Sequence, residues 1–244
     1  MGEKSGGGLK VKFMRVTYIG HSGFLVETDA CYYLFDYYKG NLPELASDKP
    51  IFVFASHGHG DHYNPEIFEI LQNLGMQQIT AVLSKDISAR KYPEGIPVVK
   101  VTFHQTYELP CRTTVRTLHS TDLGVAFLVS CPQGILYHGG DLHDWVWEGE
   151  AEQDNRQMTG NYRREIDLLA GTLEGQTLDI AFLPLDPRQE KEYAHGILYF
   201  LKKIKVRTVY PMHYWDQPEI IGKFLGEYPE YEQIVRNTER STQK

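Results

Sequence analysis

The sequence predicts a single domain of the α/β (α+β) class, in which two β-sheets pack face to face and helices cover their outer faces. Two blocks of short β-branched or aromatic segments, separated by glycine and aspartate, predict strands. Helical segments follow each block. No linker rich in proline, glycine or serine divides the blocks, so one domain can bury both sets of strands.

The first block begins as a meander of three strands, with further strands after it. A helix is expected to open at Asn64 and Pro65, because asparagine is a good N-cap and proline suits the first helical turn. A short helix is expected after Asp86. The expected strands cover residues 14–19, 23–27, 31–35, 51–55, 79–83 and 98–103.

The second block is rich in strands from Cys111 to Tyr137, and the chain then switches to helices and single strands. Residues 1–13 are expected to form a flexible N-terminal tail, and residues 14–244 form the domain. The expected strands cover residues 114–118, 124–129, 134–137, 178–183 and 206–210, and the expected helices cover 162–173, 190–203 and 218–228.

Composition excludes several classes of partner. The net charge of −7 over 244 residues provides no basic surface for nucleic acid, and no run of about 18 apolar residues predicts a membrane span. We therefore expect a small-molecule substrate, and the sequence leaves a homo-oligomer open. Cys31, Cys111 and Cys131 are far apart and odd in number, which favours buried thiols in a reducing cytoplasm over disulfides.

The most informative motif is His57-x-His59-x-Asp61-His62, which directly follows the apolar strand expected at 51–55. Neutral imidazole and carboxylate are ligands that divalent zinc, manganese and iron prefer. Glycines between the histidines let the backbone turn sharply, so one loop can aim all four side chains at one point. The motif predicts a metal site at one edge of the sandwich.

A metal site of this kind needs further ligands, and three expected strands end in suitable residues. His119 ends one strand, Asp141 follows a second after two glycines, and His213 follows a third. No Gly-x-Ser-x-Gly elbow is present to supply a protein nucleophile, and no phosphate-binding glycine-rich loop is present.

With these residues the chain resembles the metallo-β-lactamase superfamily, and the resemblance covers nearly the whole chain from about Met14. Residues 18–27 resemble the opening of the branch that includes L-ascorbate-6-phosphate lactonase. The resemblance implies the four-layer αββα sandwich and two metal ions. The first ion would be held by His57, His59 and His119, the second by Asp61, His62 and His213, and Asp141 would bridge them.

The implied chemistry is hydrolysis of a small ester, lactone or phosphoester by metal-bound hydroxide, with Asp61 and Asp141 as catalytic carboxylates. Two divalent ions about 3.5–4 Å apart lower the pKa of a shared water toward ~7. Ligands that are all histidine and aspartate suit zinc or manganese, and iron also fits. The alternatives are a diiron-type oxidoreductase and an inactive metal-binding module.

Several further residues have two interpretations. Trp145 and Trp147 either wall a substrate pocket or pack in the core. Arg188 either binds a phosphate or carboxylate or makes a surface salt bridge. Tyr214 is a candidate substrate-binding residue and proton donor. His21 either faces the pocket or is a turn histidine bonded to the backbone. Asp36 either orients a metal ligand or has a capping role, and His143 is a candidate for supporting a metal ligand or protonating the leaving group.

Overall fold

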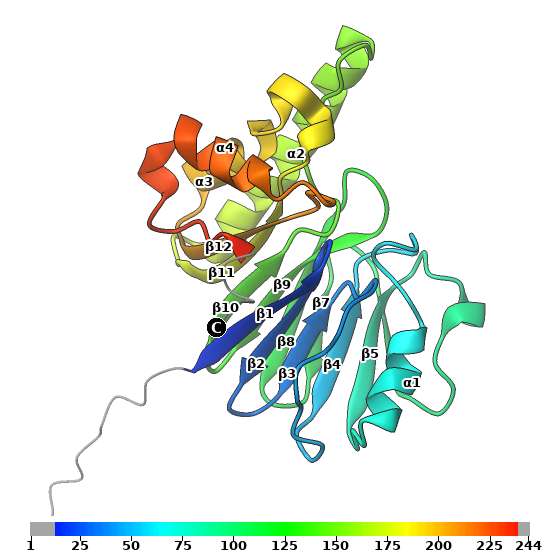
Figure 1. The fold of residues 1–244 in the computed structure, drawn as a ribbon. Helices are drawn as coiled ribbons and strands as arrows, with labels where there is room; N and C mark the ends of the chain where they lie inside the picture. The colour runs from blue at the N-terminus through cyan, green and yellow to red at the C-terminus, as the bar shows by residue number, and fades with distance from the viewer. Residues whose placement is uncertain (1–12, 239–244) are drawn as a thin grey trace, which may run out of the picture.

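The computed structural model describes residues 13–238, so residues 1–12 of the expected tail and residues 239–244 lie outside the described residues. Two six-stranded sheets pack face to face, and helices lie on both outer faces (Figure 1). This arrangement confirms the expected αββα sandwich.

The first sheet contains the strands of the N-terminal block in chain order. Its first three strands are antiparallel, and the last four pair in parallel. The strands are β1 (Met14–Gly20), β2 (Gly23–Thr28), β3 (Tyr32–Phe35), β4 (Ile51–Ala55), β5 (Ile79–Ser84) and β6 (Val98–Val101).

The second sheet contains the strands of the C-terminal half, also in chain order. Its first four strands are antiparallel, and the last three pair in parallel. The strands are β7 (Thr106–Leu109), β8 (Thr113–His119), β9 (Val125–Cys131), β10 (Gly134–His138), β11 (Leu178–Pro184) and β12 (Val206–Met212).

Phenylalanine side chains from both sheets fill the space between them. The Phe24 and Phe182 ring centroids lie 4.4 Å apart across the two sheets, and those of Phe54 and Phe127 lie 5.1 Å apart. All four side chains are fully buried. Because burying one such side chain contributes roughly 1.5–3 kcal/mol, this aromatic layer is a main source of attraction between the sheets.

The helices complete the outer layers. Helix α1 (Glu66–Asn73) packs Ile67 and Leu71 on the first sheet. Its N-cap residue is Pro65 and not the expected Asn64, although Asn64 Oδ1 accepts from the Glu66 N–H at 3.0 Å. No helix within residues 13–238 is long and apolar enough to cross a membrane. The second sheet is covered by α2 (Glu152–Leu173), α3 (His195–Lys203) and α4 (Glu219–Glu227).

The elements differ from the expectation in three places. Strand β7 was not expected, because Thr106–Leu109 is a short and mostly exposed edge strand. Helix α2 begins at Glu152, ten residues before the expected start, since its first turns are exposed and have no apolar stripe. The helix expected at 190–203 is interrupted at Glu190, where φ is 51°, so a 3₁₀ helix, η2 (Pro187–Glu192), precedes α3.

Candidate metal centre

The histidine loop leaves the first sheet at the carboxyl end of β4, beside the end of β3. Asp36, directly after β3, accepts hydrogen bonds from the Ser56 N–H at 2.7 Å and from Ser56 Oγ at 2.6 Å. These bonds join the two strand ends. The loop from His57 to His62 is therefore anchored, through the preceding Ser56, to a fully buried carboxylate.

Loops of the second sheet meet the histidine loop from the opposite side. Gly140, just after β10, has a φ of +50°, and a Cβ placed there would lie 2.6 Å from the Cβ of Ser56. Only glycine permits so close an approach and this backbone conformation without strain. The Gly139-Gly140 pair thus lets Asp141 reach the histidines across the gap between the sheets.

Two groups of potential ligands form where these loops meet. Within each group, one ligand atom per residue can be chosen so that all of them lie within 4.8 Å of one another. One group is His21, Asp61, His62 and His213; the other is His57, His59, Asp122 and Asp141.

Asp141 lies between the groups and faces both. Its Oδ1 is 3.2 Å from His62 Nε2 and 3.5 Å from His213 Nε2, whereas its Oδ2 is 3.5 Å from His57 Nε2. The two oxygens of one carboxylate therefore point at different groups. One carboxylate is thus in contact with both groups of potential ligands.

The structure brings together six of the seven residues expected to bind metal and leaves His119 outside. The His119 side chain is exposed, and its ring centroid lies 4.3 Å from that of Phe103. Its place in the second group is taken by Asp122, whose Oδ2 lies 3.7 Å from His59 Nδ1. The turn after β8, closed by a Ser120 N–H bond to the Gly124 carbonyl, carries Asp122 over the centre.

His21 also joins the centre, although the sequence left its orientation open. Its side chain is buried, its Nε2 lies 3.4 Å from Asp61 Oδ2, and its ring is 4.4 Å from that of His213. His21 and His213 both have positive φ, 55° and 61°. Backbone strain of this kind in non-glycine residues clusters at functional sites.

Three of the imidazole rings are oriented by a partner at Nδ1. His62 Nδ1 donates to Asp36 Oδ2 at 2.8 Å, His213 Nδ1 donates to Asp186 Oδ2 at 3.0 Å, and His57 Nδ1 lies 3.0 Å from Ser56 Oγ. Such partners fix the tautomer and leave Nε2 free to bind a metal.

Buried atoms without partners show that the centre suits a cation. Among the described residues, His21 Nε2, His62 Nε2 and Asp141 Oδ1 are buried and make no hydrogen bond. Leaving such a group unsatisfied costs roughly 1–3 kcal/mol. A divalent ion would accept all three atoms as ligands, so the residues present fit a metal.

Electrostatics support the same conclusion. Burial acts to lower the pKa of His62, but the Asp141 charge and the Asp36 hydrogen bond raise it more, to about 9. Burial acts to raise the pKa of Asp61, but its 3.4 Å contact with the His21 imidazole and the charge of His62 bring it well below its usual range. The carboxylates are therefore ionised, and they favour a positive charge at this point.

A cavity of about 410 Å³ opens over the two groups. Trp145, Trp147 and Arg188 line it, as the sequence allowed. Tyr214 is not among its lining residues: the side chain is buried, and its hydroxyl is 2.5 Å from Thr238 Oγ1. The next residue, Trp215, lines the cavity instead.

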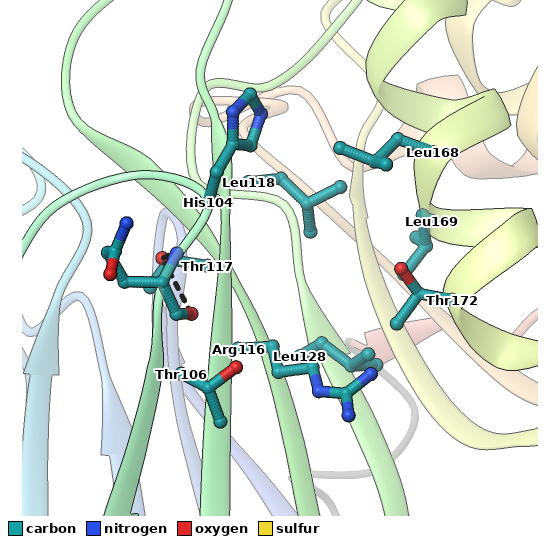
Figure 2. A pocket seen from close by; sticks show the side chains of 10 residues that line it. His104, Thr106, Arg116, Thr117, Leu118, Leu128, Leu168, Leu169 and Thr172 are labelled. Carbon is teal, nitrogen blue, oxygen red and sulfur yellow. Dashed lines mark hydrogen bonds between the residues drawn. The ribbon is translucent and has the colours of Figure 1, made fainter.

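A second cavity, of about 230 Å³, lies between the outer face of the second sheet and α2 (Figure 2). Leu118 and Leu169 contribute apolar walls. Its His104 Nε2 donates to Glu165 Oε2 at 2.9 Å, and Thr117 Oγ1 donates to the Thr102 carbonyl at 2.6 Å. Because these polar groups already have partners, this cavity provides no comparable reactive centre.

Comparisons with known proteins agree with this geometry. The β-lactamase superfamily domain matches residues 15–156. The UPF0173 metal-dependent hydrolase of Methanopyrus kandleri is 30% identical over 228 residues, which cover 85% of this chain and 86% of that protein.

Two solved structures share the fold. Igni18, a metallo hydrolase from Ignicoccus hospitalis, has a TM-score of 0.61 at 19% identity and covers 91% of this chain and 94% of its own. CmlA, a diiron β-hydroxylase from Streptomyces venezuelae, has a TM-score of 0.58 at 11% identity and covers 93% of this chain and 53% of its own. The chain therefore belongs to the metallo-β-lactamase superfamily, in its UPF0173 family of metal-dependent hydrolases.

Proposed function

We propose that this hydrolase cleaves a small ester, lactone or phosphoester at a centre of two divalent metal ions, zinc or manganese. The observation that carries the proposal is Asp141, whose Oδ1 faces His62 and His213 while its Oδ2 faces His57. Residues 18–27, which resemble the opening of L-ascorbate-6-phosphate lactonase, support including lactones in the substrate class.

The ligand set follows from the two groups. When bound, two such ions polarise the carbonyl or phosphoryl oxygen of the substrate and make water more acidic. One ion would be held by His21, Asp61, His62 and His213, and the other by His57, His59 and Asp122, with Asp141 shared between them.

The side chains around the ions have separate tasks. Hydrolysis joins the oxygen of water to the carbonyl carbon or phosphorus and breaks the bond to the leaving oxygen, which takes up a proton. Asp61, with a side chain 26% exposed at the cavity, can accept a hydrogen bond from the attacking water and orient it. Asp141 contacts both groups of ligands. Asp36 holds the imidazole of His62 in place, and Asp186 holds that of His213.

The direct test combines metal analysis with a substrate panel. Protein purified without chelator should contain close to two zinc or manganese ions per chain by elemental mass spectrometry. It should hydrolyse at least one class among esters, lactones and phosphoesters, and Asp141→Asn should lose both metal and activity. Two irons per chain would instead favour oxidation chemistry, and a metal-loaded protein inert toward the panel would favour a binding module.

A further inference from the structure

All three tryptophans of the sequence line the cavity over the metal centre. Trp145 is 8% exposed and donates its indole N–H to the Asp141 carbonyl at 2.9 Å. Trp147 stacks on it, with ring centroids 5.9 Å apart and planes 5° from parallel. Trp215 approaches from another loop, 4.6 Å from the His21 ring, and is 38% exposed. The cavity therefore offers flat apolar surface beside the ligands.

Arg188 is held between two of these rings. Its guanidinium carbon lies 4.7 Å from the centroid of Trp215 and 5.7 Å from that of Trp147. Asp186 accepts from its Nε at 2.9 Å and from its Nη2 at 2.5 Å. Within residues 13–238, Nη1 has no hydrogen-bond partner, and the side chain is 47% exposed, so a ligand can reach it.

The Arg188 charge interacts with the carboxylates of the site. Asp186 raises its pKa most, and the more distant Asp141 and Asp61 raise it further, which is consistent with its place on the wall of the same cavity. Asp186 in turn binds His213 through Nδ1. One buried carboxylate thus ties the guanidinium to a candidate metal ligand and fixes where Nη1 lies.

This arrangement discriminates between kinds of ligand. A cationic ligand that sought the tryptophan faces would meet Arg188 already placed against them. A neutral apolar ligand would cover the guanidinium without giving Nη1 an acceptor, which is costly for a charged group. A carboxylate or phosphate supplies that acceptor, and a flat ring attached to it can lie against indole surface.

Resting on the proposed hydrolase function, we propose that Arg188 and the tryptophans select a small substrate in which a carboxylate or phosphate group is attached to a planar ring near the bond to be cleaved. The cavity volume of about 410 Å³ is near the lower end of small-molecule sites, ~300–1,000 Å³, so the cavity has room for a small molecule of this kind.

Intrinsic fluorescence tests the binding part, because every tryptophan of the chain lies in this cavity. Benzoate, phenylphosphonate, acetate and benzamide are titrated into the protein with and without metal. Benzoate and phenylphosphonate should bind about tenfold more tightly than benzamide, a difference typical of one charge-assisted contact. Acetate should bind more weakly than benzoate, and equal binding would overturn the role of the ring.

Matched variants isolate Arg188. Arg188→Gln should remove the preference for the anions, and Arg188→Lys should keep part of it, since lysine retains the charge without the planar fork. The control is Arg207→Gln, which alters an exposed arginine on β12 that pairs with Asp179 of β11, and this variant should bind like the wild type. Metal content is measured for each variant. If Arg188→Gln still bound benzoate and phenylphosphonate in preference to benzamide, both with and without metal, the proposal would be overturned.

Hydrolysis separates this inference from the proposed function. Monomethyl phthalate, which carries a carboxylate beside its ester, should have a kcat/KM about tenfold above that of methyl benzoate, and the difference should lie in KM. Equal cleavage of both esters would leave the hydrolase in place and refute the selection of anions. Cleavage of neither, with benzoate still bound through Arg188, would refute the hydrolase proposal for such esters and leave the binding site.

Discussion

Asp36 Oδ2 accepts a hydrogen bond from His62 Nδ1 at 2.8 Å, and both side chains are fully buried. Burial acts to raise the pKa of Asp36, but His138 and His62 lower it more, to about 2. Asp36 is therefore a carboxylate over the whole neutral range. Its charge makes the His62 ring a better metal ligand and keeps Nε2 directed at Asp141.

Replacing Asp36 with asparagine should weaken metal binding while preserving the size of the side chain. We expect the affinity for zinc to fall about 10–100-fold, as is typical when a carboxylate behind a histidine ligand is removed. Competition with a chromophoric chelator measures it. Asp167→Asn, which alters an exposed pair with Lys203, is the control, and wild-type affinity in Asp36→Asn would contradict the role of Asp36.

We expect substitutions of His119 and Asp122 to have opposite effects on metal binding by the second group of ligands. Asp122→Ala should lose about one metal ion per chain, because its carboxylate lies beside His59, whereas His119→Ala should keep the full complement. Elemental mass spectrometry on both purified variants makes the comparison. The reverse pattern would return His119 to the ligand set and require the turn after β8 to move.

The fold could be predicted well because alternating and aromatic strand segments carry a strong local signal. The two sheets and the loop from His57 to His62 follow from such segments and from glycine placement. Polar segments carry no such signal, which is why the first ten residues of α2 and the edge strand β7 were missed.

Two of the three candidate ligands predicted at strand ends lie at the centre, and His119 at the end of β8 does not; the candidates in turns were not predicted. Asp141 follows β10 after two glycines and His213 directly follows β12, so a strand pattern locates them. Asp122 depends on how the turn after β8 folds, and His21 depends on a positive φ that no residue pattern encodes. Trp215 and not Tyr214 faces the cavity for the same reason, since φ of Trp215 is 54°.

Removal of metal should destabilise the folded protein. The buried His62 Nε2 and Asp141 Oδ1 have no hydrogen-bond partner within residues 13–238, so an ion that binds them only in the folded state adds stability. At a free metal concentration of 100 times Kd, one site contributes about 2.7 kcal/mol. Thermal denaturation should show a lower Tm after chelation and recovery when zinc or manganese is returned.

The control for this experiment is Asp141→Asn, which removes the carboxylate shared by both groups. Its Tm should respond much less to added metal than that of the wild type. A wild-type Tm that is unchanged by chelation, in protein shown to have lost its metal, would contradict a structural contribution from the ions.

Gly140→Ala should destabilise the protein and separate the two loops that form the centre. The added Cβ would lie 2.6 Å from the Cβ of Ser56, and φ at this position is +50°. We expect the free energy of unfolding to fall by roughly 1–3 kcal/mol, as for overpacking in a filled site. Gly160→Ala on exposed α2, where no atom lies within 4 Å, should instead raise it by roughly 0.5–1 kcal/mol. Urea denaturation measures both; equal effects would mean that the contact between Gly140 and Ser56 does not hold the sheets together at the metal centre.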